Sequence, residues 1–262
     1  MRLIANISLL FAERPMRERF AAAREAGFAG IEIQFPYDED AERLRRWKGD
    51  TPLVLINLPA GRPDLGDVGL STDAARRRDF AAGLETALRY AETLRVEKVN
   101  VLAGAPPPGQ PDSDTVTVLG DNLRLAAERM AGIGVRVVIE AVNPFDVPGY
   151  WLDGLDRALA FLDGLESPAA DLQFDLYHMA RTEPDLANAI HRAGPLIGHV
   201  QFADAPGRRE PGTGAIDFAA AFAALHAIGY DGAVGAEYRP TLPTERNLGW
   251  MAQARRWMEQ AG

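Results

Sequence analysis

Apolar positions along the chain follow two alternating patterns, which predict a regular succession of strands and helices. Short runs rich in Val, Ile and Leu are typical of buried strands, whereas apolar residues three or four apart mark the inner face of a helix. The run Arg136–Glu140 is the clearest strand of this kind, and the clearest helical face is formed by Phe80, Leu84, Leu88 and Ala91. The pattern therefore predicts an α/β fold.

Eight strand-like runs follow one another, with helix-like runs between them. The predicted strands are residues 3–8, 30–33, 53–57, 98–102, 136–140, 172–175, 197–201 and 233–237. The predicted helices lie near residues 15–26, 41–47, 72–91, 119–130, 155–165, 184–193, 218–228 and 245–258. This order predicts a (β/α)₈ TIM barrel, with residues 1–262 as a single domain. A doubly wound open sheet is the alternative, but no Gly-x-Gly-x-x-Gly turn follows the first predicted strand.

Length and charge narrow the classes of protein that fit this pattern. A chain of 262 residues is long enough for one sizeable core. Its 28 basic and 37 acidic residues give a net charge of −9, which disfavours a nucleic acid partner. No apolar run approaches the roughly 18 residues of a membrane span, and the N-terminus lacks a cleavable signal pattern. We therefore expect a cytoplasmic protein with no membrane partner.

The absence of cysteine removes several kinds of chemistry. With no cysteine in the sequence, disulfides, thiolate catalysis and Cys-based zinc sites are excluded. Any catalytic or metal-binding group must come from carboxylate, amide, imidazole or hydroxyl side chains.

Polar side chains end four consecutive predicted strands, namely Glu140, Asp175, Gln201 and Glu237. In a barrel of this type the C-terminal ends of the strands form the face that carries the active site. Carboxylates held close together there would repel one another unless a cation lies among them. Each residue alone is more often hydrogen-bonded locally, but four at equivalent positions favour a shared site. An all-oxygen set suits Mg²⁺, with Mn²⁺ as the alternative.

Seven segments of the chain carry a more specific signal. They are residues 5–11, residues 35–38, residues 57–61, Glu140 with Asn143 and residues 145–149, residues 175–178, residues 199–201 with 209–214, and residues 237–238. Together they resemble, over nearly the whole length, the hydroxypyruvate isomerase family, a branch of the xylose-isomerase-like TIM barrels that includes 2-oxo-tetronate isomerases. The chain departs from this family in the loop at 62–69, at Ile56 and at Ala141. These departures leave the exact substrate open.

The resemblance implies roles for the four polar strand ends. Glu140 and Glu237 would form the acid/base pair of the reaction. Glu140, Asp175, Gln201 and Glu237 would bind the metal ion. Related epimerases carry histidine at the position of Gln201, so glutamine here completes an all-oxygen set and favours Mg²⁺.

The resemblance also implies which residues bind the substrate. His178 resembles a substrate-contacting histidine, although a histidine packed under the barrel rim is an equally weighted alternative. Arg208 is favoured over Arg209 for binding a carboxylate, because a guanidinium pairs with that group through two hydrogen bonds. A solvated loop is the alternative for both arginines. Asn6 and Asn57, which lie in two of the matching segments, are also assigned to substrate binding.

The implied reaction interconverts hydroxypyruvate and tartronate semialdehyde. The C2 carbonyl and C3 hydroxyl of hydroxypyruvate can chelate one divalent ion, which would stabilise the enediolate formed when a C3 proton leaves. One glutamate would remove that proton and the other would supply one to C2. The sequence leaves open which glutamate removes the C3 proton and which supplies the proton to C2. A hydride shift would use the same ligands, but proton transfer is favoured because both glutamates would lie beside the reacting carbons.

Other functions remain as alternatives. A 2-oxo-tetronate isomerase or an epimerase or isomerase of small keto sugars would use the same site, and a lyase could expel a β-hydroxyl from a cyclic keto-polyol. A hydrolase of the endonuclease IV kind would need clustered histidines and a basic face. The four histidines of the sequence and its net charge of −9 argue against this class. A non-catalytic barrel is disfavoured by the two glutamates. The expected partner is a small hydroxy-keto acid, and a homo-oligomer is left open.

Overall fold

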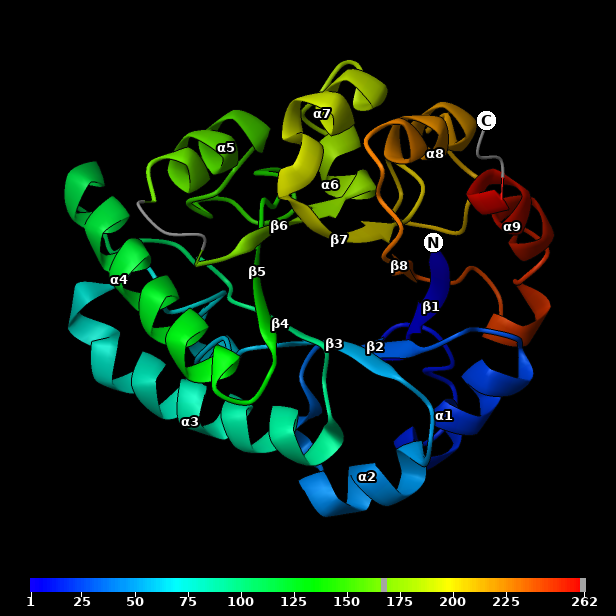
Figure 1. The fold of residues 1–262 in the computed structure, drawn as a ribbon, viewed down its shortest axis with the longest axis horizontal. Helices are drawn as coiled ribbons and strands as arrows, with labels where there is room; N and C mark the ends of the chain where they lie inside the picture. The colour runs from blue at the N-terminus through cyan, green and yellow to red at the C-terminus, as the bar shows by residue number, and fades with distance from the viewer. Residues whose placement is uncertain (166–168, 260–262) are drawn as a thin grey trace.

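Eight parallel strands pair in chain order, and the last pairs with the first to close a barrel. The strands are β1 (Arg2–Asn6), β2 (Ile31–Ile33), β3 (Leu53–Asn57), β4 (Lys98–Asn100), β5 (Arg136–Glu140), β6 (Asp171–Asp175), β7 (Ile197–Phe202) and β8 (Ala233–Ala236). The computed structural model describes residues 1–165 and 169–259. It confirms the predicted (β/α)₈ barrel (Figure 1).

Helices surround the barrel on its outside (Figure 1). They are α1 (Met16–Glu25), α2 (Ala41–Lys48), α3 (Arg77–Leu94), α4 (Asp112–Ala131), α5 (Leu155–Asp163), α6 (Leu176–Ala180), α7 (Leu186–Ala193), α8 (Phe218–Ala227) and α9 (Met251–Glu259). The predicted apolar face of α3 is largely confirmed, because Phe80, Leu84 and Ala91 are buried. Among the described helices, none combines the length and the apolar character needed to cross a membrane.

Some predicted boundaries are wrong by a few residues, because short 3₁₀ turns replace the ends of helices. The helix predicted from residue 72 begins at Arg77, after the 3₁₀ turn Ala74–Arg76, in which the N–H of Ala75 donates to the Asp73 side chain. The helix predicted from residue 245 begins at Met251, after the 3₁₀ turn Thr244–Arg246. The remaining 3₁₀ turns are Pro36–Asp38, Pro63–Leu65 and Gly194–Leu196.

Helix α6 has no counterpart in the predicted elements. It begins directly after β6, where the Asp175 carboxylate accepts a hydrogen bond from the backbone N–H of Tyr177 at 2.9 Å. An aspartate at this position satisfies an N–H group that has no partner within the helix. The strand end and the helix cap are thus the same residue, which fixes the Asp175 side chain at the mouth of the barrel.

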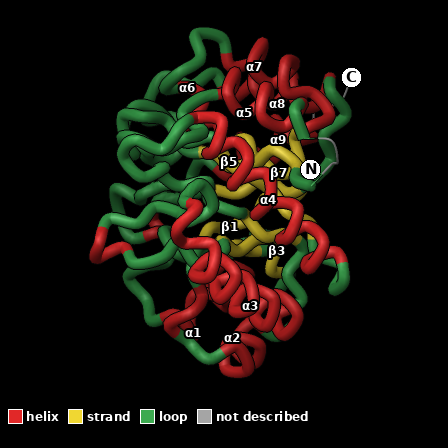
Figure 2. Tube along the Cα trace, turned by 90° about the vertical axis from the view of Figure 1, so that its left-hand side faces the viewer, coloured by secondary structure: helices red, strands yellow, loops and turns green. Residues whose placement is uncertain are grey.

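The interior of the barrel changes from apolar to polar along its axis. Near the N-terminal ends of the strands, Ile4, Val54 and Ala233 form a small separate apolar cluster. Nearer the C-terminal ends, Glu32 and Gln201 are buried and face each other. The connecting loops gather on the side of the barrel opposite the N-terminus, at the left in Figure 2. The polar end of the interior therefore opens beneath these loops.

Candidate active site

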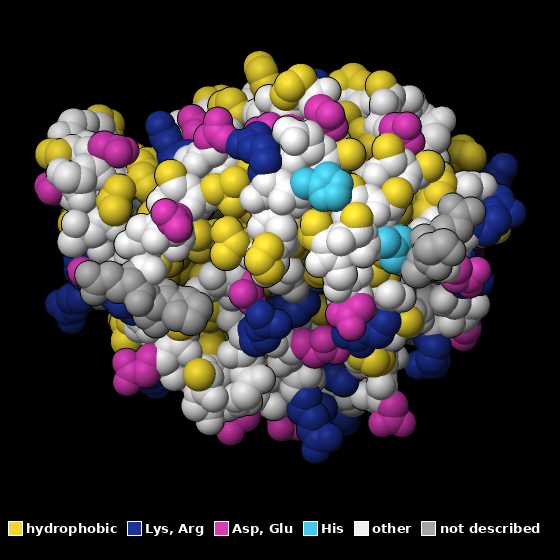
Figure 3. All heavy atoms as spheres, turned by 45° about the horizontal axis from the view of Figure 1, so that its top comes forward, with side chains coloured by type: hydrophobic (Ala, Val, Ile, Leu, Met, Phe, Trp, Pro, Cys, Tyr) yellow, Lys and Arg dark blue, Asp and Glu magenta, His cyan; other side chains and the backbone are white. Residues whose placement is uncertain are grey.

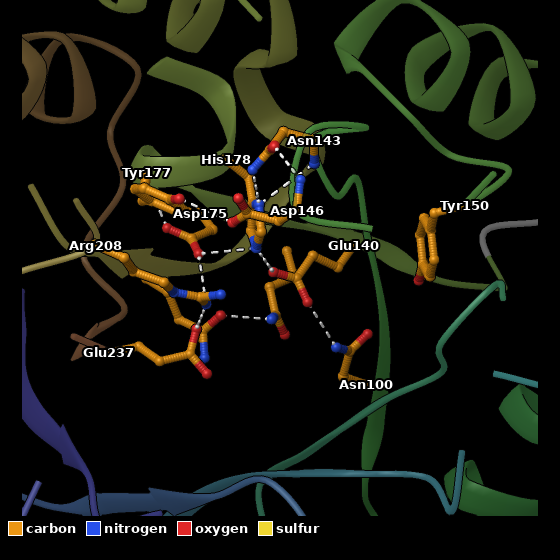
Figure 4. Close-up of polar contacts among 12 residues, drawn as sticks. Asn100, Glu140, Asn143, Asp146, Tyr150, Asp175, Tyr177, His178, Arg208 and Glu237 are labelled. Atoms are coloured by element: carbon orange, nitrogen blue, oxygen red, sulfur yellow. Dashed lines mark hydrogen bonds and ion pairs between the residues drawn. The ribbon is translucent and has the colours of Figure 1, made fainter. Parts of the chain in front are cut away.

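Three carboxylates meet at the C-terminal mouth of the barrel (Figure 4). Glu140 is the last residue of β5, Asp175 is the last residue of β6, and Glu237 immediately follows β8. All three are buried, with exposed fractions of 6%, 0% and 4%. Buried carboxylates need hydrogen-bond donors or cations to offset the loss of water.

Arg208 supplies one positive charge to this cluster. Its Nη2 donates to Glu237 Oε2 at 2.6 Å and to Asp175 Oδ2 at 3.4 Å, and the guanidinium lies over the ring of Tyr177. Burial opposes the charged form, but the three carboxylates outweigh it and raise the pKa of Arg208. The structure thus places Arg208 inside the site, which the sequence left undecided between a site residue and a solvated loop.

The charge of the cluster suits a divalent cation. When the three carboxylates are ionised, Arg208 balances one negative charge and leaves two. Burial raises the pKa of Asp175. Burial, with repulsion from Glu237 and Asp175, raises the pKa of Glu140 well above its usual value of 4.5. A bound divalent ion would relieve this repulsion, and carboxylate oxygens are the ligands that Mg²⁺ and Mn²⁺ prefer.

The two glutamates have different surroundings. Glu237 accepts hydrogen bonds at its Oε1 from Asn6 Nδ2 at 2.9 Å and Gln34 Nε2 at 2.7 Å, besides the bond from Arg208 at its Oε2. Glu140 accepts one side-chain hydrogen bond, from Asn100 Nδ2 at 3.1 Å. Burial raises the pKa of Glu237, but Arg208 and Gln34 oppose that shift. The donors around Glu237 therefore favour its ionised form more strongly than those around Glu140.

His178 completes a compact group with two of the carboxylates. One ligand atom each from Glu140, Asp175 and His178 lies within 4.8 Å of the others. Burial, together with the charge of Arg208, lowers the pKa of His178 to about 3. The imidazole is therefore neutral. The structure thus places His178 beside the carboxylates, and its contact with a substrate stays a prediction.

Gln201 points into the barrel beneath the carboxylates. Its Nε2 donates to Glu32 Oε1 at 2.7 Å, and its Oε1 accepts from Gln173 Nε2 at 2.6 Å. Because a carbonyl oxygen has two lone pairs, this oxygen retains the capacity to bind a metal ion. Its role as a metal ligand stays a prediction.

Glu32 anchors a buried network that sequence reasoning missed. Its carboxylate accepts from Asn6 Nδ2 at 3.0 Å and from Gln201, and it lies 2.9 Å from His199 Nε2. Burial raises the pKa of Glu32 to about 7, although the bonds from Gln201 and Asn6 oppose the shift. Asn6 thus links Glu32 to Glu237 and supports the site from below. A polar residue within an otherwise apolar strand was the available signal.

The site opens into a pocket of about 290 Å³. Its lining includes Gln34, Asn57, Glu140, His178, Arg208 and Glu237. This volume lies at the lower limit of typical ligand pockets, about 300 Å³, and suits a small molecule. Asn57 reaches the pocket wall, and its backbone oxygen accepts a hydrogen bond from Tyr37 at 2.6 Å.

The loop that carries Arg208 is built around Asp204, which sequence reasoning also missed. Asp204 is 1% exposed and its two oxygens accept four backbone hydrogen bonds. The donors are the N–H groups of Ala205, Gly212, Gly214 and Ile216, at 2.9, 2.8, 2.9 and 3.1 Å. Arg208 itself has a left-handed backbone with a φ of 52°. Because non-glycine residues adopt that conformation at a cost, the loop must hold it in place.

The surface drawn in Figure 3 carries charges of both signs. Lys and Arg side chains lie interspersed with Asp and Glu over the described part of this face, without a separate basic patch. Electrostatic binding of a nucleic acid backbone relies on such a patch. The expectation that nucleic acid is not a partner stays a prediction.

Three comparisons with known proteins bear on this geometry. The family model described as "Xylose isomerase-like TIM barrel" matches residues 20–261. Hydroxypyruvate isomerase of Escherichia coli K12 is 39% identical over 253 residues, which cover 96% of this chain and 98% of the relative. A 2-oxo-tetronate isomerase of Cupriavidus necator is 35% identical over 252 residues, or 95% and 97% of the two chains.

A solved structure extends the similarity to three dimensions. A crystal structure from Brucella melitensis, described as an AP endonuclease of family 2, superposes with a TM-score of 0.92 at 34% identity. The match covers 96% of this chain and 98% of that one. Barrel and connecting elements are therefore shared almost completely.

Proposed function

We propose that this protein interconverts hydroxypyruvate and tartronate semialdehyde, because the chain belongs to the xylose isomerase-like TIM barrel family and is an isomerase related to hydroxypyruvate and 2-oxo-tetronate isomerases. The observation that carries the proposal is the cluster of three buried carboxylates and Arg208 around a pocket of about 290 Å³. The pocket suits a small substrate, and the arginine suits its carboxylate.

A divalent metal ion, Mg²⁺ in the first place and Mn²⁺ as the alternative, is part of the proposal. Glu140 and Asp175 would hold it, with Gln201 and Glu237 as the remaining ligands. When bound, the ion would polarise the substrate carbonyl and offset negative charge on the enediolate. Even with Glu140 protonated, Asp175 and Glu237 carry one more negative charge than Arg208 balances, which supports a cation among these side chains.

The residues of the chain divide the proton transfers between them. Glu237, whose ionised form is favoured by Asn6, Gln34 and Arg208, removes the proton from C3. Glu140, whose pKa is raised, delivers a proton to C2, and the C3 hydroxyl proton moves to the C2 oxygen. Hydroxypyruvate thereby becomes tartronate semialdehyde with no gain or loss of atoms.

A coupled assay tests this proposal. The purified protein is incubated with Mg²⁺ and hydroxypyruvate, and a semialdehyde reductase reports the product. Glu140→Gln and Glu237→Gln should each lower kcat by about 10²–10⁴-fold, the usual contribution of a general acid or base. Glu18→Gln, the same change at a partly exposed residue of α1 far from the carboxylates in the chain, is the control. Turnover unaffected by either site substitution would contradict the mechanism.

A longer substrate is the second candidate, and one observation favours it. The site pocket shares Phe35, Ala60 and Pro63 with a neighbouring groove of about 750 Å³. A four-carbon substrate such as 2-oxo-tetronate could extend from the carboxylates toward this groove. Turnover of 2-oxo-tetronate in the same assay, with none of hydroxypyruvate, would replace the first candidate by the second.

A further inference from the structure

His178 lies where it could serve the site in either of two ways. Its Nε2 is 3.6 Å from Asp175 Oδ2 and 3.9 Å from Glu140 Oε1, so it could bind a metal ion beside these carboxylates. It could instead donate a hydrogen bond to a bound molecule. A metal ligand needs a lone pair on Nε2, whereas a donor needs a proton there. The contacts of the other ring nitrogen, Nδ1, decide between these roles.

Asn143 presents two donors to Nδ1 of His178. Its backbone N–H donates to Nδ1 at 3.3 Å, and its side-chain Nδ2 lies 2.7 Å from the same atom. A backbone N–H can only donate, so Nδ1 must offer a lone pair.

The orientation of the Asn143 amide is fixed independently. Its Oδ1 accepts hydrogen bonds from the backbone N–H groups of Phe145 at 3.1 Å and Asp146 at 3.0 Å. Turning the amide over would place its NH₂ group against these two donors. The oxygen therefore faces the loop, and the NH₂ group faces Nδ1.

With its lone pair on Nδ1, the neutral imidazole carries its proton on Nε2. The distances from Nε2 to Asp175 and Glu140 exceed those of a hydrogen bond. His178 also lines the pocket, and its side chain is only 3% exposed. An N–H group that is buried, lines the pocket and lies beyond hydrogen-bond distance of these carboxylates is placed to meet an oxygen of a bound molecule.

We propose that Asn143 is a positioning residue: its contacts keep the proton of His178 on Nε2, so that this imidazole, which the family resemblance already assigns to substrate contact, meets the substrate as a hydrogen-bond donor. The assignment to a substrate rests on the proposed function. The position of the proton does not, because it follows from the contacts of Asn143 alone.

Nitrogen NMR of the ¹⁵N-histidine-labelled protein tests the position of the proton directly. The signals of His178 are identified as those lost in His178→Gln. In the metal-free wild-type protein, Nδ1 should have the shift of an unprotonated nitrogen and Nε2 that of a protonated one. Addition of Mg²⁺ should leave this pattern unchanged. A proton on Nδ1, or loss of the Nε2 proton on addition of Mg²⁺, would overturn the proposal. This measurement needs no turnover, so a failed isomerase assay would leave its result intact.

The substitution Asn143→Asp tests the positioning role. It retains the oxygen that holds Phe145 and Asp146 but replaces the NH₂ group near Nδ1 by a carboxylate oxygen. The backbone N–H of residue 143 remains, but its contact with Nδ1 is the longer of the two, 3.3 Å against 2.7 Å, and a carboxylate oxygen at the shorter contact attracts a proton. Nδ1 should therefore become protonated, and the KM for hydroxypyruvate should rise about tenfold, equivalent to about 1.4 kcal/mol. Asn188→Asp, the same change at an exposed position of α7, should alter neither. A folded Asn143→Asp protein with Nδ1 still unprotonated would refute the role of Asn143.

Discussion

Replacing Asp204 by asparagine should loosen the loop that holds Arg208 in the site. An asparagine oxygen can accept two of the four backbone hydrogen bonds that the carboxylate accepts. The amide NH₂ group would then face the other two N–H donors. Each N–H group that loses its acceptor costs about 1–3 kcal/mol, and because these groups are half-buried we expect about 2–4 kcal/mol in all.

Two measurements follow the effect of Asp204→Asn. Urea denaturation gives the change in the free energy of unfolding, which should fall by the amount above. Initial rates with hydroxypyruvate give the kinetic effect. The KM should rise more than kcat falls, because Arg208 is proposed to bind the substrate carboxylate and its left-handed backbone depends on this loop.

The control for this prediction is Asp217→Asn, the same change at the end of the same loop. Asp217 caps α8 by accepting one hydrogen bond, from the N–H of Ala220 at 3.0 Å. Asparagine caps helices about as well as aspartate, so stability and KM should both stay near the wild-type values. An unchanged urea midpoint for Asp204→Asn would refute the energetic reasoning. A loss of stability with an unchanged KM would refute the link to Arg208.

Three further predictions concern the charged site. Because the pKa of Glu140 is raised in the folded protein, the folded state keeps a proton that the unfolded chain releases above pH 4.5. In thermal melts at several pH values, the Tm of the metal-free protein should therefore fall as the pH rises above 4.5, and it should fall less steeply in Glu140→Gln. Mg²⁺ at a hundred times its Kd for the wild-type protein should stabilise that protein by about 2.7 kcal/mol, and it should stabilise Asp175→Asn far less. Equal stabilisation of both proteins in thermal melts would argue against the metal site. Arg208→Lys should raise the KM for hydroxypyruvate about tenfold with a smaller change in kcat, since lysine cannot form the paired hydrogen bonds of a guanidinium; initial rates with an unchanged KM would contradict this.

The barrel could be predicted from the sequence because each strand is a short apolar run and each longer helix has apolar residues three or four apart. Both patterns depend only on residues close together in the chain. The convergence of Glu140, Asp175 and Glu237 followed from the barrel itself, since parallel strands deliver their C-terminal ends to one face. Helix α6 escaped prediction because it is only a short helix, capped by Asp175, and too short to show a period.

The hydrogen-bond partners of the site could not be predicted from the sequence. Glu32 and Asn100 lie within strands, where a polar residue gives no local sign of which neighbour it meets. Asp204 is buried by a loop whose path depends on the four N–H groups that it binds. The role of His178 depends on which nitrogen faces Asn143, and that is set by tertiary contact.

The bond between Asn6 and Glu237 joins residues 231 positions apart in the chain. Asn6 lies in β1 and Glu237 follows β8, so the two meet only when the last strand pairs with the first and closes the barrel. During synthesis on a ribosome, a chain lacking its final strand would contain Glu140 and Asp175, and the donors Asn6, Gln34 and Arg208, but not the third carboxylate that these donors bind. The site is thus complete only when the barrel is closed, and an incomplete chain cannot carry out the proposed chemistry.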